Sequence, residues 1–131
     1  MSRVAIDASA LLALLRDEPG AAVTAEHLRR SCLSSVNLSE VLEQVLHKER
    51  GVDRVLALLK NWQVEIVAFD AHQAGIAADI KHQIGTANLC FADRACLALA
   101  RSREIPALTA DREWSSLPLD VAVIQIRGAG R

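Results

Sequence analysis

Four acidic residues stand at the ends of apolar runs, where a chain seldom places charge. They are Asp7, Glu40, Asp93 and Asp111. Carboxylates at the ends of buried elements are costly because desolvation and mutual repulsion both oppose their ionised forms. If the four converge, they form an all-oxygen site suited to Mg²⁺ or Mn²⁺. The chemistry that such a site favours is metal-assisted cleavage of phosphodiester bonds.

The elements that would position these acids alternate between strand and helix. The strands are predicted at 4–6, 32–34, 64–69, 106–109 and 121–126. The helices are predicted at 9–15, 21–30, 38–49, 52–62, 71–84 and 91–102. This alternation predicts an α/β fold, a three-layer α/β/α sandwich with a mostly parallel sheet. Ligands bind beyond the carboxyl ends of such strands, and Asp7 and Asp111 each follow a strand, so we expect them to meet there.

Three of the acids also have an ordinary structural interpretation. Asp7 or Ser9 could cap the helix that follows, or the Ser9 hydroxyl could orient a carboxylate of the site. Asp93 could cap its own helix or interact with the helix dipole. That helix is apolar nearly all round, which places it in the core and favours a functional Asp93. Asp111 is either a turn aspartate or a metal ligand.

Glu40 is the acid that periodicity supports least. At about 100° per residue, an apolar stripe runs over 38–46, and Glu40 points away from it together with Glu43. This polar face is either solvated or a wall of the crevice. The histidines are predicted to lie on the surface; they are His27, His47, His72 and His82.

Composition limits the size and the partners of the protein. The chain has 131 residues, of which 51% are hydrophobic, so we expect a single domain over 1–127 and a flexible tail over 128–131. With 16 acidic and 15 basic residues there is no broad basic surface, and a nucleic acid must be held locally or through metal. The three cysteines lack zinc-site spacing and indicate free thiols in a reducing cytoplasm. No run is long enough to cross a membrane.

Four segments resemble, in order, the acidic motifs of the PIN domain family. They are 4–12, 34–41, 92–100 and 106–114, and they span nearly the whole chain. The compact length is similar to that of VapC-type toxins of toxin–antitoxin pairs. Two positions depart from the family pattern. Ala92 stands where many relatives have glycine, and Leu97 stands where some have a further acid.

The resemblance implies a metal-dependent endoribonuclease whose acidic site is Asp7, Glu40, Asp93 and Asp111, with Mg²⁺ or Mn²⁺ as cofactor. For the toxin branch it also implies inhibition by a cognate antitoxin. Cleavage by an activated water leaves a 5′-phosphate and a 3′-hydroxyl. Apolar stretches at 38–46 and 55–59, together with the resemblance, predict a homodimer.

Other residues beside the acids could assist. Ser9 and Thr109 offer hydroxyl groups that orient carboxylates. Arg94 and Arg112 are candidates for phosphate contacts, with surface ion pairing as the alternative. Because aromatic residues are few, the sequence favours a structured RNA read by its shape over a long single strand.

The sequence argues against two other functions and leaves a third open. A haloacid-dehalogenase-like phosphatase requires a second aspartate two residues after the first, where this chain has Ser9. A receiver-like signalling module requires paired acids and a late lysine, and 105–111 contains no lysine. A PIN domain used in housekeeping RNA processing, or kept as a non-catalytic binding module, remains open on sequence alone.

Overall fold

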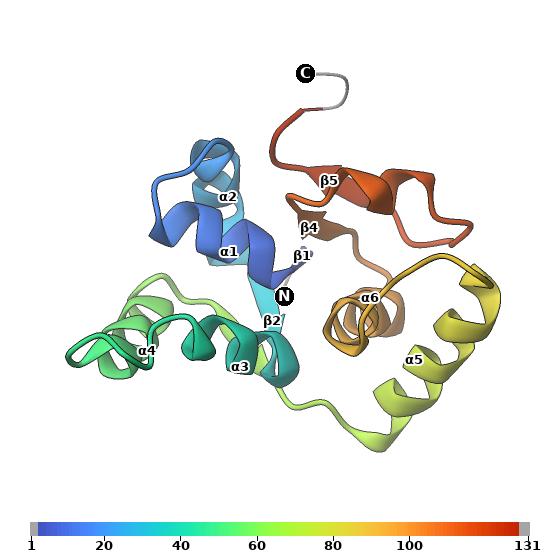
Figure 1. Ribbon diagram of the computed structural model, residues 1–131, viewed down its shortest axis with the longest axis horizontal. Helices are drawn as coiled ribbons and strands as arrows, with labels where there is room; N and C mark the ends of the chain where they lie inside the picture. The colour runs from blue at the N-terminus through green and yellow to red at the C-terminus, as the bar shows by residue number, and fades with distance from the viewer. Residues whose placement is uncertain (1–2, 129–131) are drawn as a thin grey trace.

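The computed structural model describes residues 3–128, which form one α/β layered structure (Figure 1). The strands are β1 (Val4–Ile6), β2 (Ser31–Ser34), β3 (Glu65–Val67), β4 (Ala107–Thr109) and β5 (Val123–Gln125). The α-helices are α1 (Ala8–Leu15), α2 (Ala21–His27), α3 (Ser35–Glu43), α4 (Gly51–Asn61), α5 (Ala71–Ile84) and α6 (Phe91–Arg103). Two short 3₁₀ helices, η1 (Leu28–Arg30) and η2 (Arg112–Ser116), complete the described part. Of the predicted tail, 129–131 lies outside the described residues.

All five strands are parallel, in the order β3-β2-β1-β4-β5. Strands β2 and β3 are added in turn on one side of β1, and β4 and β5 are then added on its other side. The strand order therefore reverses between β1 and β4, and such a switch point is where open α/β sheets form their sites. The predicted α/β fold is confirmed, with a sheet that is parallel throughout.

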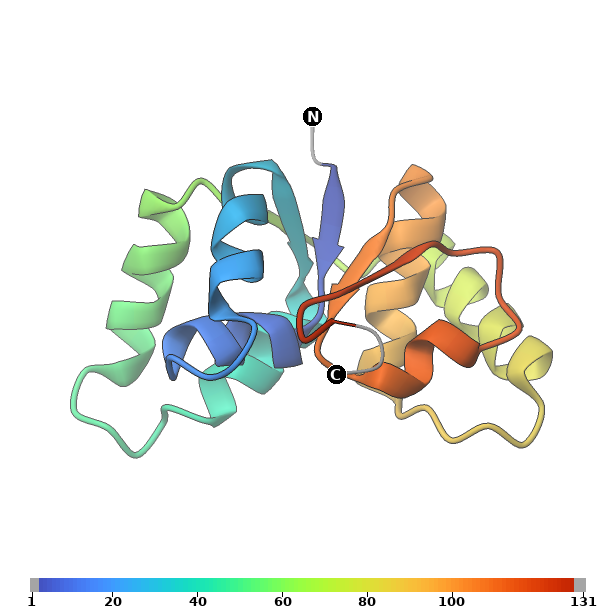
Figure 2. The ribbon, with the colours of Figure 1, turned by 90° about the horizontal axis from the view of Figure 1, so that it is seen from above.

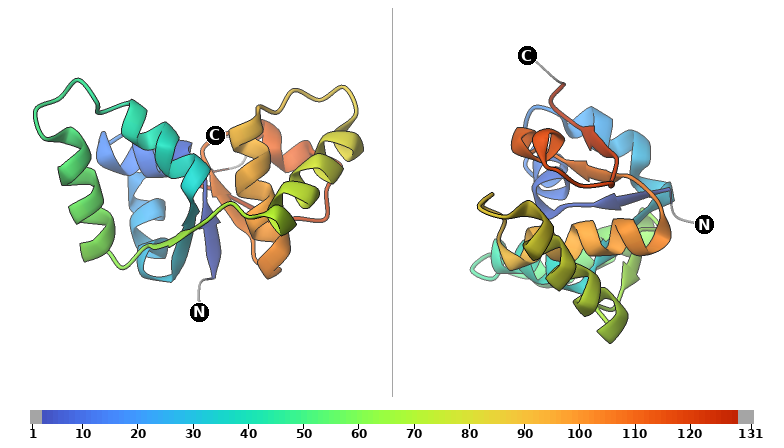
Figure 3. Two further views of the ribbon diagram at one scale, coloured as in Figure 1. Left: turned by 90° about the horizontal axis from the view of Figure 1, so that it is seen from below. Right: turned by 90° about the vertical axis from the view of Figure 1, so that its right-hand side faces the viewer.

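Two hydrophobic cores cover the two faces of the sheet. On one face, side chains of β1, β2 and β4 pack against α1, α3 and α4. On the other, Ala5 and Ala107 pack against α5 and α6. Figures 2 and 3 show these two groups of helices on opposite sides of the strands. Residues 95–100 of α6 are all buried, as their apolar pattern predicts, because small alanine side chains allow this helix to lie close to the sheet.

The main error in the predicted elements concerns α3. It was expected over 38–49, but it begins at Ser35, where the Ser34 hydroxyl accepts a hydrogen bond from the Val36 amide, and it ends at Glu43. The following turn packs against Gly51, where a Cβ atom would clash with the Val45 carbonyl oxygen. The end of the apolar stripe therefore falls outside the helix, and Leu46 is 60% exposed.

The other differences are smaller. The segment predicted as one helix over 21–30 is α2 followed by the 3₁₀ helix η1, and β3 and β5 are shorter than expected. The 3₁₀ helix η2 was not predicted. Among the described residues, no helix is both long enough and apolar enough to span a membrane.

Candidate acidic active site

Asp7 lies directly after β1 and is only 4% exposed. Although it occupies the residue before α1, its side chain makes no capping hydrogen bond. Instead, its Oδ2 accepts hydrogen bonds from the Ser9 hydroxyl at 2.6 Å and from the Thr109 hydroxyl at 2.9 Å. The capping interpretation of Asp7 is therefore wrong. The carboxylate is buried at the carboxyl end of the central strand and is held by two hydroxyl groups.

The same hydroxyls connect Asp7 to the end of β4. The Ser9 Oγ accepts from the Ala110 amide at 3.0 Å, and the Thr109 Oγ1 accepts from the Asp111 amide at 3.0 Å. The Asp111 Oδ1 accepts from the Glu113 amide at 2.9 Å and so caps η2, as the turn interpretation predicts. This network fixes the ends of two neighbouring parallel strands against each other, as expected from their positions in the sheet.

Glu40 is half-buried on α3 and is positioned by Asn37, which was not among the predicted site residues. The Asn37 side chain is fully buried, and its Nδ2 donates to Glu40 Oε1 at 3.1 Å and to the Ala92 carbonyl oxygen at 3.0 Å. Both partners are acceptors, which fixes the orientation of the amide. Asn37 thus ties the helix carrying Glu40 to the start of α6. The three-residue spacing of Asn37 and Glu40 could have indicated this contact only if the helix had been predicted to begin before Asn37, as α3 does.

Asp93 lies in the first turn of α6 and is half-buried. Its Oδ2 accepts a hydrogen bond from the Cys90 amide at 3.3 Å, so it does cap the helix. The interaction with the helix dipole also favours an acid at this end. Only one carboxylate oxygen takes part in the cap.

The four acids are linked by their charges. Burial raises the pKa of Asp7 to about 6, the Ser9 and Thr109 hydrogen bonds oppose this shift, and the charges of Asp93 and Glu40 add to it. Burial also raises the pKa of Glu40 and that of Asp93; the charge of Asp93 adds to the first shift, and that of Asp111 adds to the second. Among residues 3–128, Arg101, Arg103 and Arg127 form ion pairs with other acids, so none of these three arginines neutralises the cluster. The four acids therefore concentrate negative charge.

The chemistry of these donors fits a divalent cation. In the described part of the chain, no three His, Cys, Asp or Glu side chains are already arranged as ligands of one ion. The hydrogen bonds described above nevertheless hold one oxygen of each carboxylate in place. Mutual repulsion opposes the ionised forms of such groups unless a cation neutralises them. Carboxylate oxygens oriented in this way suit a hard cation such as Mg²⁺.

The remaining candidates are two arginines, each of which directly follows one of the acids, and the four histidines. The Arg94 guanidinium donates to the Ala77 carbonyl oxygen of α5 at 3.4 Å and lies 5.7 Å from the centre of the Phe91 ring. Arg112 is exposed at the start of η2. His47, His72 and His82 are exposed, as predicted, whereas His27 is half-buried and contacts the Val23 carbonyl oxygen.

A sequence model of the PIN domain matches residues 4–118, so the chain belongs to the PIN domain family. Its fold is similar to that of a toxin–antitoxin complex from Klebsiella pneumoniae, with a TM-score of 0.77 and 17% identity over 94% of this chain and 97% of that one. The DNA-bound VapBC of Salmonella typhimurium gives a TM-score of 0.73 and 19% identity, over 96% and 99% of the chains. Mycobacterium tuberculosis VapC20 is described as a toxin that cleaves the sarcin–ricin loop. Its fold matches with a TM-score of 0.71 and 17% identity, over 86% of this chain and 93% of that one. A search of curated proteins finds no match.

The raised pKa of Asp7 predicts how stability depends on pH without metal. The folded-state pKa is about 6, above the usual 3.8, so between these values the folded state binds more protons than the unfolded state. Stability is therefore expected to fall as the pH rises through this window, by at most about 3 kcal/mol from this group. The measurement is urea unfolding between pH 4 and 7 in EDTA, comparing the wild type with Asp7→Asn. The free energy of unfolding of the wild type should decline with rising pH, and that of Asp7→Asn should decline less. Equal pH dependence in the two proteins would show that Asp7 does not have a raised pKa.

Proposed function

We propose that this PIN domain is a metal-dependent endoribonuclease and acts as the toxin of a toxin–antitoxin pair. The observation that carries the proposal is the group of four carboxylates at the switch point of the sheet, which are coupled by their charges and are each held by at least one hydrogen bond. Family membership and the likeness in fold to VapC toxins support the reaction class and the biological role. Asp7, Glu40, Asp93 and Asp111 are proposed as the ligands of Mg²⁺ or Mn²⁺.

The protein's own residues prepare the site for this reaction. Ser9 and Thr109 donate to Asp7 Oδ2, which fixes the orientation of the most buried of the four carboxylates. Asn37 does the same for Glu40. When bound, a divalent cation supplies an activated water and neutralises the charge that develops on the phosphate. The products are a 5′-phosphate and a 3′-hydroxyl, because the ribose hydroxyl takes no part. Arg112, next to Asp111, is the proposed phosphate contact.

Mapping of new RNA ends tests the proposed function. Induced expression in a bacterial host, with and without the adjacent open reading frame, is followed by sequencing of RNA 5′ ends. The expected result is growth arrest with a small set of new 5′-phosphate ends, both abolished by the neighbouring gene. New ends bearing a 5′-hydroxyl would contradict the mechanism. Normal growth with slow processing of one RNA would instead indicate a housekeeping nuclease.

The partners are proposed to be an antitoxin and a second copy of the chain. Leu46, Leu56 and Leu58 are large apolar side chains left at least 36% exposed, which is consistent with protein contacts on this side. A mass measurement by light scattering should give twice the mass of one chain.

An antitoxin arginine paired with the acid cluster would compete with metal, so inhibition of RNA cleavage by the antitoxin should weaken as the Mg²⁺ concentration rises. Inhibition that does not respond to metal would rule out insertion of a cation at the acids.

A further inference from the structure

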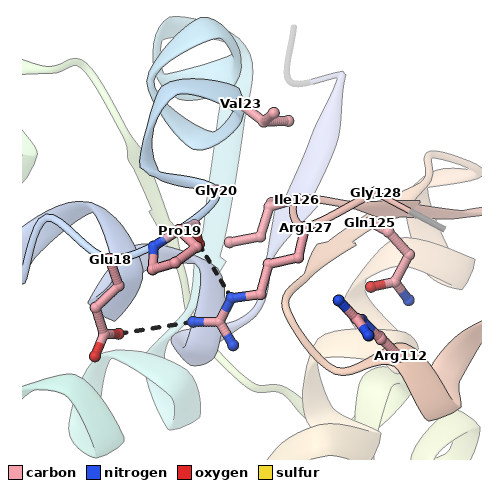
Figure 4. A pocket seen from close by; sticks show the side chains of 9 residues that line it. All are labelled: Glu18, Pro19, Gly20, Val23, Arg112, Gln125, Ile126, Arg127 and Gly128. Carbon is pink, nitrogen blue, oxygen red and sulfur yellow. Dashed lines mark hydrogen bonds and ion pairs between the residues drawn. The ribbon is translucent and has the colours of Figure 1, made fainter. Parts of the chain in front are cut away.

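An open groove of about 780 Å³ is lined by none of the four proposed metal ligands (Figure 4). One wall is the turn between α1 and α2, and the other is formed by the end of β5 with the residues after it. Arg112, which directly follows Asp111, also lines it. The groove therefore begins one residue away from an acid of the proposed site.

The two walls touch at Gly20. This glycine has a φ of 96°, and a Cβ atom on it would lie 2.7 Å from the Ile126 side chain and 2.9 Å from the Ile126 carbonyl oxygen. No side chain fits between the walls, so the turn rests directly on the end of β5. Because the Ile126 amide donates to the Thr109 carbonyl oxygen at 3.0 Å, this contact is also fixed to β4.

A hydrogen-bond network holds the groove in register with the acids. The Gln125 Nε2 donates to the Asp111 carbonyl oxygen at 2.8 Å and to the Ser115 hydroxyl at 2.9 Å. The peptide that carries both Asp111 and Arg112 is therefore fastened to β5. A ligand in the groove is positioned relative to the acid cluster by the sheet itself.

The groove combines positive charge with apolar side chains. The Arg127 Nε donates to the Pro19 carbonyl oxygen at 3.0 Å, while its Nη2 lies 3.8 Å from Glu18 Oε1, beyond hydrogen-bond distance. Within the described residues, the other N–H groups of this guanidinium donate no hydrogen bond, so they can bind an anion. Figure 4 shows the Arg112 and Arg127 side chains along the groove, with Val23 supplying apolar contact.

On the basis of the proposed nuclease function, we propose that this groove holds one nucleotide of the RNA strand next to the cleaved bond. The phosphate lies between the guanidinium groups of Arg112 and Arg127, which match phosphate oxygens in geometry as well as charge. The base packs on the half-buried Val23, since Ile126 is only 3% exposed and its side chain lies against Gly20. Since the chain carries a net charge of −1 and has no broad basic surface, two cations in one groove are a substantial share of its capacity to hold RNA.

The test measures RNA binding rather than cleavage. The probe is a fluorescently labelled RNA stem–loop, titrated in excess EDTA at two salt concentrations and followed by anisotropy. Arg112→Gln and Arg127→Gln are each expected to weaken binding by roughly fivefold to tenfold. Each should also reduce the slope of log affinity against log salt by about 0.7 to 1, as expected for one lost phosphate contact.

Two controls separate this contact from general effects. Arg3→Gln removes an equal charge before β1, at the opposite end of the strand from Asp7, and should leave binding nearly unchanged. Glu18→Gln breaks the same ion pair as Arg127→Gln but keeps the Arg127 guanidinium. This variant should therefore bind the RNA as tightly as the wild type or more tightly. Thermal melts of every variant check that the turn at Pro19 survives loss of the Arg127 bond, and Arg112→Gln provides an independent variant.

The outcomes distinguish the two proposals. If Arg112→Gln and Arg127→Gln bind the stem–loop as tightly as Arg3→Gln at both salt concentrations, the groove proposal is wrong even when the wild type cleaves RNA with Mg²⁺. If the wild type cleaves no RNA with Mg²⁺ or Mn²⁺, the nuclease function fails, and the binding data still decide whether the groove holds RNA.

Discussion

Replacing Asp7 or Asp93 by asparagine is expected to reduce RNA cleavage by roughly a hundredfold or more while the fold stays intact. Loss of groups that only orient metal ligands typically costs 10- to 100-fold, and loss of a ligand itself should cost at least as much. Asparagine keeps the size of the side chain, and its amide oxygen can still accept the hydrogen bonds of Ser9 and Thr109 at position 7. What it removes is the charge that balances the cation.

The stability of these variants separates a catalytic role from a structural one. Removing one acid relieves repulsion and, at position 7, also a buried charge, so melting temperatures at pH 7.5 in EDTA should equal or exceed that of the wild type. Asp79→Asn, on the exposed side of α5, is the matched control and should change neither activity nor stability. A large loss of stability in both Asp7→Asn and Asp93→Asn, or full cleavage in excess EDTA, would contradict the metal mechanism.

The sequence predicted the parts of the site that depend on strand position. Asp7 and Asp111 follow β1 and β4, and in a parallel sheet the carboxyl ends of neighbouring strands lie together. The buried position of α6 could be predicted because its apolar residues leave no polar face. These inferences need only the local pattern and the rule that parallel strands share one functional edge.

The parts that could not be predicted depend on contacts between distant segments. Periodicity orients Glu40 relative to its own helix but does not show what that face meets, and the bond from Asn37 to the Ala92 carbonyl joins residues 55 positions apart. The early end of α3 follows from the packing of Val45 on Gly51. The groove depends on the contact of Gly20 with Ile126, and neither residue belongs to a motif.

Asn37 is expected to be the most sensitive position outside the acids. It is fully buried, and replacing it by alanine removes the donor to Glu40 and leaves the Ala92 carbonyl oxygen without this bond. Loss of these two hydrogen bonds and of the packed side chain should lower the free energy of unfolding by about 2–3 kcal/mol. Asn61→Ala, on an exposed residue of α4, should change it by no more than about 0.5 kcal/mol.

Cleavage by Asn37→Ala, measured well below its melting temperature, distinguishes a positioning residue from a purely structural one. The Asn37 hydrogen bond lowers the pKa of Glu40, which burial raises, so its loss should move that pKa further up. If Glu40 must be ionised to hold the cation, the acidic limb of the pH–rate profile should shift to higher pH, and activity at neutral pH should fall by roughly 10- to 100-fold. The defect should shrink as pH or Mg²⁺ is raised, since both favour the ionised, metal-bound form. An unshifted pH profile with lowered stability would show that Asn37 joins α3 to α6 without preparing Glu40 for metal.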